Sequence, residues 1–212
     1  MKMVMKTKVV ALALLLGLST GARAEGCFIN GDFGLNAFPN RADSANAVVY
    51  QAGAAYSSSS QTTTSFGFGV DVGQWVSQRF GWEIGYADFG NVTGYSSFGN
   101  SFGSAFGISY KYASTATHVE LLAGSNSGLF GKVGFYNAST QLSIQGQTIS
   151  PKGSSGMFFG IGGRYPSDRL DHWAYRFGID VYPRIKFTDL ADSSKATSGI
   201  ITKIYLGEDY TF

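Results

Sequence analysis

Apolar residues alternate with small or polar residues along most of the chain after residue 24. In 173–182, for example, the aromatic residues Trp173, Tyr175 and Phe177 alternate with a second set that includes Arg176 and Gly178. A period of two residues is typical of a β-strand whose two faces meet different surroundings. This pattern predicts eight strands, at 28–38, 66–72, 80–86, 113–123, 129–136, 157–165, 173–182 and 200–212.

The predicted connections between these strands alternate in length. The long connections, rich in Ser, Thr, Asn and Gly, span 39–64, 90–108, 138–156 and 183–199, whereas the short ones span 76–79, 124–128 and 166–172. No stretch after residue 24 approaches the length of a transmembrane helix. The alternation predicts an all-β fold: an eight-stranded antiparallel up-and-down transmembrane β-barrel with short periplasmic turns and long extracellular loops.

The two faces of the predicted strands differ in bulk. One is built of Phe, Tyr, Trp and aliphatic residues, and the other is mostly Gly with a few charges; the chain has 29 Gly and only 14% charged residues, against about 25% in an ordinary soluble domain. Eight strands enclose a space just wide enough for side chains. We therefore predict that the Gly face lines the lumen and the bulky face contacts lipid. A soluble lipocalin-like carrier remains an alternative.

Most charged residues of the strands fall on the predicted lumen face. They are Asp71, Glu83, His118, Glu120, Lys132, Arg164, Arg176 and Asp180, together with Asp32 and Asp209. An unpaired buried charge is unstable, so these groups are expected to pair with one another.

Equal spacing about the short turns suggests how the lumen charges pair. Centring one turn on position 126 places Glu120 opposite Lys132. Centring the other two on 77 and 170 predicts a hairpin with two acids, Asp71 and Glu83, and another with Arg164 and Arg176. These two hairpins lie on opposite walls, so we expect the acids to reach across the lumen to the arginines. The network either plugs the pore or forms a gated ion path.

Three tryptophans flank the short turns. Trp75, Trp82 and Trp173 are predicted to form an aromatic girdle at one membrane interface. Strict alternation from Phe66 points Trp75 inward, so this interpretation requires the strand at 66–72 to end or bulge before Trp75.

The first 24 residues have the layout of a secretory signal peptide. Lys2, Lys6 and Lys8 precede an apolar run over 9–16, and cleavage is predicted after Ala24. Four of the 16 basic residues and no acidic residue lie in this segment, so the mature chain has 12 basic and 14 acidic residues and a net charge of −2. That balance does not favour nucleic-acid binding. The barrel domain is predicted to span 25–212.

The one cysteine, Cys27, limits the chemistry of the chain. A single Cys excludes an intramolecular disulfide framework and a multi-Cys zinc site. Cys27 follows the small residue Gly26, as in a lipoprotein signal, but the aliphatic residue expected three positions before the Cys is absent. Cys27 is therefore either a lipidated residue or, as this absence favours, a small apolar residue at a strand start. No cofactor-binding motif or metal-ligand cluster is visible, and we predict neither.

The last residues alternate in the same way as the strands. Leu206, Tyr210 and Phe212 resemble the C-terminal signal by which the outer-membrane assembly machinery recognises barrels, although Glu208 departs from that pattern. A charge at that position is tolerated close to the membrane interface. The assembly machinery is therefore an expected partner.

Two segments resemble a known family. Residues 81–90 (GWEIGYADFG) and 129–135 (LFGKVGF) are similar to the third and fifth strands of OmpA-like outer-membrane barrels. The resemblance covers essentially all of 25–212. It implies a location in the bacterial outer membrane among lipid and lipopolysaccharide, a largely plugged lumen and contacts through surface loops. Because the chain ends at its last predicted strand, we do not expect the peptidoglycan-binding function of full-length OmpA.

The sequence favours a structural or interactive role over catalysis. A lipid A-modifying barrel enzyme would need a serine beside a histidine base, and His118 lacks a serine on its face, whereas His172 follows Asp171 in a short turn. Aromatic residues with small polar spacers, as in antibody loops, suit surface contacts. Tyr95, Phe98, Phe102 and Phe106 therefore either contact a host or cell-surface partner or form an upper girdle.

Overall fold

The computed structural model describes residues 25–42, 56–99, 105–190 and 192–212. The predicted signal peptide, residues 1–24, lies outside this part of the chain. The described residues form ten strands: β1 (Glu25–Ala37), β2 (Tyr56–Gln61), β3 (Thr64–Trp75), β4 (Phe80–Gly99), β5 (Ala105–Gly124), β6 (Leu129–Ile144), β7 (Gln147–Thr148), β8 (Lys152–Pro166), β9 (Trp173–Thr188) and β10 (Ala196–Thr211).

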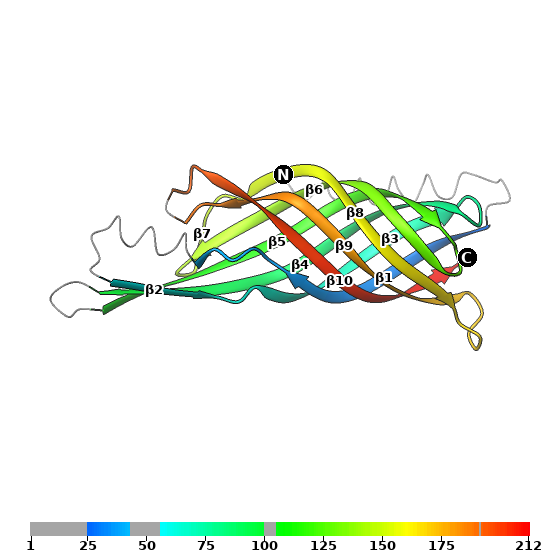
Figure 1. Ribbon diagram of the computed structural model, residues 1–212, viewed down its shortest axis with the longest axis horizontal. Coiled ribbons are helices and arrows are strands. Elements are labelled where there is room, and N and C mark those ends of the chain that lie inside the picture. Colours follow the sequence, from blue (N-terminus) through cyan, green and yellow to red (C-terminus); the bar gives the residue numbers. More distant parts are fainter. Residues whose placement is uncertain (1–24, 43–55, 100–104, 191) are drawn as a thin grey trace.

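Eight of these strands close into a ring. Each pairs antiparallel with its neighbours in the order β1, β3, β4, β5, β6, β8, β9 and β10, and β10 pairs with β1. The result is an elongated barrel whose short turns gather at one end (Figure 1). The predicted eight-stranded antiparallel barrel is confirmed. Among the described residues, no helix has the length and hydropathy needed to cross a membrane.

The strands extend well beyond the predicted bounds. The connection expected at 90–108 is mostly strand, since β4 runs to Gly99 and β5 begins at Ala105; β6, β8, β9 and β10 likewise take up most of 138–156 and 183–199. At these outer ends the outward-facing residues are polar, whereas inward-facing ones such as Leu142 and Phe187 are apolar, so the hydropathy alternation reverses its sense while the backbone ladder continues. The predicted long loops were therefore too long.

Two short strands, β2 and β7, were not predicted. β2 pairs with the outer end of β4, and β7 pairs with the outer end of β6. Together β2, the outer half of β4 and the start of β5 form a three-stranded arm that projects from the barrel on the side of the long connections (Figure 1).

Two of the three predicted turn centres were wrong by one residue, which moves the cross-strand partner of each residue by two positions. Val76 N donates to Phe80 O and Ser125 N to Leu129 O, both at 2.9 Å, so these turns centre on 78 and 127 rather than 77 and 126. Asp71 consequently faces Gly85, and Lys132 faces Leu122. In the third hairpin, Arg164 faces Arg176 as expected.

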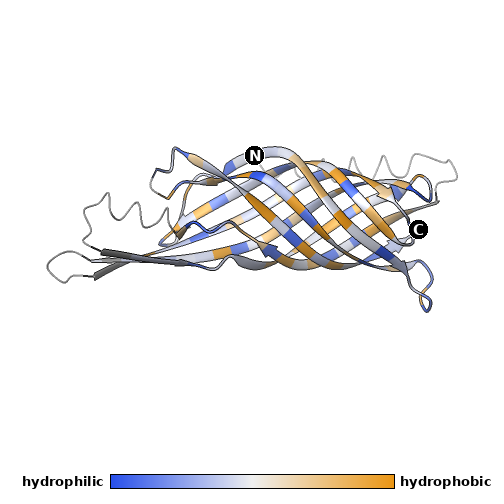
Figure 2. Ribbon diagram, in the orientation of Figure 1, coloured by the Kyte–Doolittle hydropathy of each residue, from blue (hydrophilic) through white to orange (hydrophobic). Residues whose placement is uncertain are grey.

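The outer face of the barrel carries a continuous apolar belt. Bands of hydrophobic residues cross every strand around the middle of the barrel (Figure 2). Exposed members of the belt include Ile29, Phe33, Phe66, Phe68, Val119, Leu121, Val133, Phe135, Phe159, Ile161, Phe177, Ile179, Ile204 and Leu206. In water so many exposed apolar side chains would drive aggregation, whereas lipid accommodates them. The outside of the barrel is therefore a membrane-spanning surface.

Candidate functional site

The barrel interior is filled by three successive layers of side chains. Beside the short turns lies a small apolar layer of Phe28, Trp75, Leu122 and Phe130. A layer of charged residues follows, and a large aromatic layer occupies the end near the long connections. Along β6, for example, Phe130, Lys132 and Tyr136 represent these layers in order, because every second residue points inward.

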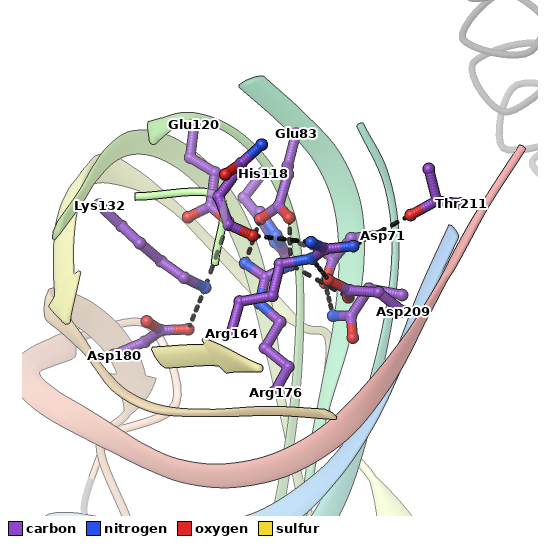
Figure 3. A network of polar contacts seen from close by, with 12 residues as sticks. Asp71, Glu83, His118, Glu120, Lys132, Arg164, Arg176, Asp180, Asp209 and Thr211 are labelled. Carbon is purple, nitrogen blue, oxygen red and sulfur yellow. Dashed lines mark hydrogen bonds and ion pairs between the residues drawn. The ribbon is translucent and has the colours of Figure 1, made fainter. Parts of the chain in front are cut away.

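An ion pair crosses the charged layer between opposite walls. Arg176 on β9 donates from Nη1 to Glu83 Oε1 and from Nη2 to Glu83 Oε2, the latter at 2.7 Å. Figure 3 shows the two side chains meeting inside the barrel. Both are almost completely buried. This bidentate pair fixes the distance between β4 and β9, as was expected for an acid reaching across the lumen to an arginine.

Arg164 lies closer to the short-turn end and bonds three groups. Its Nε donates to Asp209 Oδ2 at 2.7 Å, its Nη1 to the Asn126 carbonyl at 2.7 Å, and its Nη2 to Thr211 Oγ1 at 3.0 Å. Asp209 Oδ1 also lies 3.6 Å from Arg176 Nη1. Asp209 therefore links the two arginines, which face each other on β8 and β9 and would otherwise repel.

Lys132 occupies the opposite side of the charged layer. Its Nζ lies 3.3 Å from Glu120 Oε1 and 3.2 Å from Asp180 Oδ2, and 4.8 Å from the centre of the Tyr205 ring. The expected pairing of Glu120 with Lys132 exists, but it is a diagonal contact because the register differs from the prediction.

Asp71 does not reach an arginine. Its Oδ1 lies 2.9 Å from His118 Nε2, and its Oδ2 accepts a hydrogen bond of 2.8 Å from Asn30 Nδ2. The expectation that both hairpin acids bond the arginine pair is wrong for Asp71, because the register places it beside β5 and β1. Two residues after Asn30 on β1, farther from the short turns, Asp32 Oδ1 lies 2.5 Å from Lys203 Nζ.

The charged layer has more carboxylates than cations. Among the described residues it contains six acids, four Lys or Arg residues and His118. Glu83 and Glu120 face each other directly on β4 and β5. The layer is thus a connected network in which each charge has a partner on another strand.

The aromatic layer fills the remaining lumen. Phe158 stacks on Tyr182 with ring centres 4.7 Å apart, and the Phe89 ring meets Tyr182 edge-on at 4.9 Å. Tyr112 donates to the Thr188 carbonyl at 2.7 Å, and Tyr136 donates to the Pro183 carbonyl. These contacts join β4, β5 and β6 to β9 by side chains alone, and they add a ring stack to the backbone ladder between β8 and β9.

The segment after β1 covers the aromatic layer. Phe38 packs edge-on against Phe187 at 6.3 Å, and the Arg41 guanidinium lies 5.1 Å above the same ring. Arg41 N also donates to Gln61 Oε1 at 2.8 Å, which ties this segment to β2. Burial in this apolar setting lowers the pKa of Arg41 from its usual value.

Three solved structures that are similar to this chain are distant from it in sequence. No family model and no curated protein matches the chain. Among solved structures, Ail of Yersinia pestis is 12% identical, covering 88% of this chain and 99% of Ail with a TM-score of 0.45. OprG of Pseudomonas aeruginosa is 13% identical, with 88% and 97% covered and a TM-score of 0.48. Neisserial surface protein A is 13% identical, with 89% and 99% covered and a TM-score of 0.41. Likenesses this distant decide nothing about activity.

The tryptophans divide between the two faces. Trp173 is exposed on the outer surface and Trp82 is partly exposed there, whereas Trp75 is buried inside, 6.1 Å from the Phe130 ring. The assignment of Trp75 to an interfacial girdle is therefore wrong. β3 continues without a break to Trp75, and the irregularity lies in β1, where Gly26 adopts a φ of 67°.

Three of the four aromatic residues proposed for loop contacts lie in the strands of the arm. Tyr95 is exposed on β4, and Phe98 pairs with Phe106 in the register of β4 and β5. Phe102 lies outside the described residues. At the other end of the barrel, Tyr210 and Phe212 face outward and their rings are 5.4 Å apart.

Two components of the interior were missed at the level of the sequence. Lys203 was not assigned to the charged layer. It lies an even number of residues from Asp209 on the last strand, so both side chains point to the same face, and this spacing would have placed Lys203 there. The aromatic layer was missed for two reasons: Tyr136, Phe158 and Tyr182 lie on the strand face assigned to Gly and charges, and Leu142, Ile185 and Phe187 lie where loops were expected.

Proposed function

We propose that this chain is a bacterial outer-membrane β-barrel protein with a structural or surface-contact role and a largely plugged lumen. The observation that carries the proposal is the combination of an apolar outer belt with an interior filled by ion pairs and aromatic rings. A soluble carrier would have the opposite arrangement, with an apolar cavity inside and charges outside.

Cell fractionation tests the proposed location. We expect the protein in the outer-membrane fraction, with a different gel mobility before and after boiling, because folded barrels resist detergent until heated. N-terminal sequencing should find Glu25 as the first residue if residues 1–24 are removed on export. Recovery in a soluble fraction, or a mobility that boiling does not change, would contradict the proposal.

Planar-bilayer recording tests the plugged lumen. The refolded barrel is expected to show little or no conductance, because the Arg176–Glu83 pair and the aromatic layer occupy successive levels of the interior. Frequent openings of the wild-type barrel would favour the second candidate, a small ion channel gated by the same charged residues.

The projecting arm favours a contact function over a purely structural one. Strands β2, β4 and β5 extend beyond the belt, and Tyr95 on β4 is 52% exposed. Deleting residues 95–103 is expected to reduce host-surface binding or self-aggregation while leaving the heat-dependent mobility shift intact. Tyr95→Ser is a milder companion variant. If both variants bind as wild type, the arm has no role in contact.

We also propose that the barrel is not a lipid A-modifying enzyme. His118 is buried in the charged layer and contacts Asp71, which supports a role in the network. A lipid A deacylation assay on the purified barrel is expected to give no product. Activity that disappears in a His118→Ala variant would overturn this part of the proposal.

A further inference from the structure

Strand β9 contains a β-bulge near the outer edge of the apolar belt. Tyr182 pairs with Ile201 and Ile185 pairs with Gly199, so Pro183 and Arg184 together face the single residue Ile200. Pro183 has no amide hydrogen, and Arg184 adopts a φ of 62°. A positive φ is unfavourable for a residue with a side chain and persists only where the surrounding structure holds it.

The bulge reverses which residues of β9 face the lumen. Below it, even-numbered residues up to Tyr182 point inward, whereas above it Ile185 and Phe187 point inward and are almost completely buried. Without the extra residue, strict alternation would place Arg184 and Lys186 inside the aromatic layer. The bulge instead places both cations on the outer wall, where both are exposed.

These two cations lie directly above the belt. Arg184 is three residues beyond the outward-facing Val181, which corresponds to about 10 Å along the strand. Ile200, opposite the bulge, is 54% exposed, and Ser198, opposite Lys186, is exposed as well. Neither cation forms an ion pair or a side-chain hydrogen bond with the residues that the structure describes.

We propose that Arg184 and Lys186 bind the phosphate groups of lipid A in the outer leaflet. The inference rests on the proposed location, since it requires a membrane whose outer headgroups are anionic. Two unpaired cations complement those phosphates, and the belt below them continues the same surface for acyl chains. Cations at this height bind anionic headgroups while apolar neighbours remain in the hydrocarbon.

Other exposed cations lack this setting and provide controls. Lys195 lies 3.3 Å from Asp192, within a connection beyond the strands. Lys111 is exposed on β5, eight residues beyond the belt residue Val119, which corresponds to about 26 Å along the strand, so it lies farther from the belt than Arg184 does. Neutralising either of these residues should not affect a phosphate site at the bulge.

Lipid binding to the purified barrel in detergent micelles tests the proposal. Native mass spectrometry would measure the bound fraction during titration with bisphosphorylated lipid A, with the same lipid A lacking both phosphates, and with inorganic phosphate as competitor. The double variant Arg184→Gln/Lys186→Gln is expected to bind phosphorylated lipid A about 25-fold more weakly, at about fivefold per cation. Arg184→Lys should retain most of the affinity, as should Lys111→Gln.

Each outcome has one meaning. Weaker binding of dephosphorylated lipid A by the wild type, with no displacement by inorganic phosphate, supports a lipid A site. Equal binding of both lipids, or an unaffected double variant with a normal mobility shift, would show that the bulge serves only to bring Ile185 and Phe187 inside. Outer-membrane fractionation of the same proteins separates this failure from failure of the proposed function, which would place even the wild type elsewhere.

Discussion

The charged and aromatic layers occupy neighbouring parts of the same lumen but hold the walls together differently. In the charged layer each contact is specific: Arg176 needs Glu83, and Asp71 needs His118. In the aromatic layer Tyr182 touches Phe89, Tyr136 and Phe158 together, so no single contact is essential. The comparison teaches that charges specify which walls meet, whereas rings stabilise through the area that they bury.

The largest effect is expected from breaking the central ion pair. Glu83→Ala leaves the Arg176 guanidinium buried without its main partner and should lower the free energy of unfolding by about 3–5 kcal/mol. Urea unfolding in lipid vesicles, followed by gel mobility, measures the loss. Planar-bilayer recording should show more frequent openings, and unchanged stability together with unchanged conductance would refute the network.

A double variant serves as control for the ion pair. Glu83→Leu/Arg176→Met removes both charges with side chains of similar size, and it should recover most of the stability lost in Glu83→Ala. If the double variant is less stable than the single one, the pair contributes more than the relief of an uncompensated charge.

A smaller loss is expected from the aromatic layer. Phe158→Ala removes a ring that stacks on Tyr182, and it should cost about 3 kcal/mol, near the lower end for buried aromatic residues, because neighbouring rings can relax. Adding a second substitution, Tyr182→Ala, should lower the free energy of unfolding further. If the double variant is instead more stable than Phe158→Ala alone, the two layers do not differ in the way proposed.

One hydrogen bond of the aromatic layer should contribute less. Tyr112→Phe removes the bond to the Thr188 carbonyl but keeps the ring between Tyr110 and Phe187, so unfolding should become easier by about 1 kcal/mol. The same urea titration measures this effect. A loss as large as that of Phe158→Ala would mean that this bond, rather than ring burial, holds the outer end of β9.

The smallest effect is expected outside both layers. Lys195 and Asp192 form an exposed ion pair that water and salt screen. Lys195→Gln should therefore leave the urea midpoint unchanged within error. Hydrogen bonds from the Ser194 hydroxyl and backbone amide, together with the Lys195 ammonium, hold the pKa of the Asp192 carboxyl below its usual range. A group this exposed nevertheless has little influence on folding. A shifted midpoint would show that exposed charges count as much as buried ones.

The sequence predicts the barrel well because lipid and lumen impose opposite demands on alternate residues. All eight ring strands and the turn regions at 76–79, 124–128 and 166–172 were located from that contrast. The contrast fades where the strands leave the membrane. There Ser, Thr and Asn occupy the outer face, and the bulges at Gly90 and Arg184 shift the alternation by one residue.

The charged layer was predictable in membership but only partly in pairing. Parity along the strands identifies which residues face inward, including Glu83 and Arg176. The partners depend on register, and a shift of one residue in a turn centre moved Asp71 from the arginines to His118. Register is determined by turn hydrogen bonds, such as that from Val76 N to Phe80 O, which composition does not reveal.

The ladder between β1 and β10 has a consequence for the order of events during folding. It pairs Phe28 with Thr211, whereas the β3–β4, β5–β6 and β8–β9 ladders each join strands linked by a short turn. The chain entropy lost on loop closure rises by about 0.6 kcal/mol for each doubling of the separation. We therefore expect hairpins to form first and the ring to close last, so that the incomplete barrel passes through an open sheet with two unpaired edges.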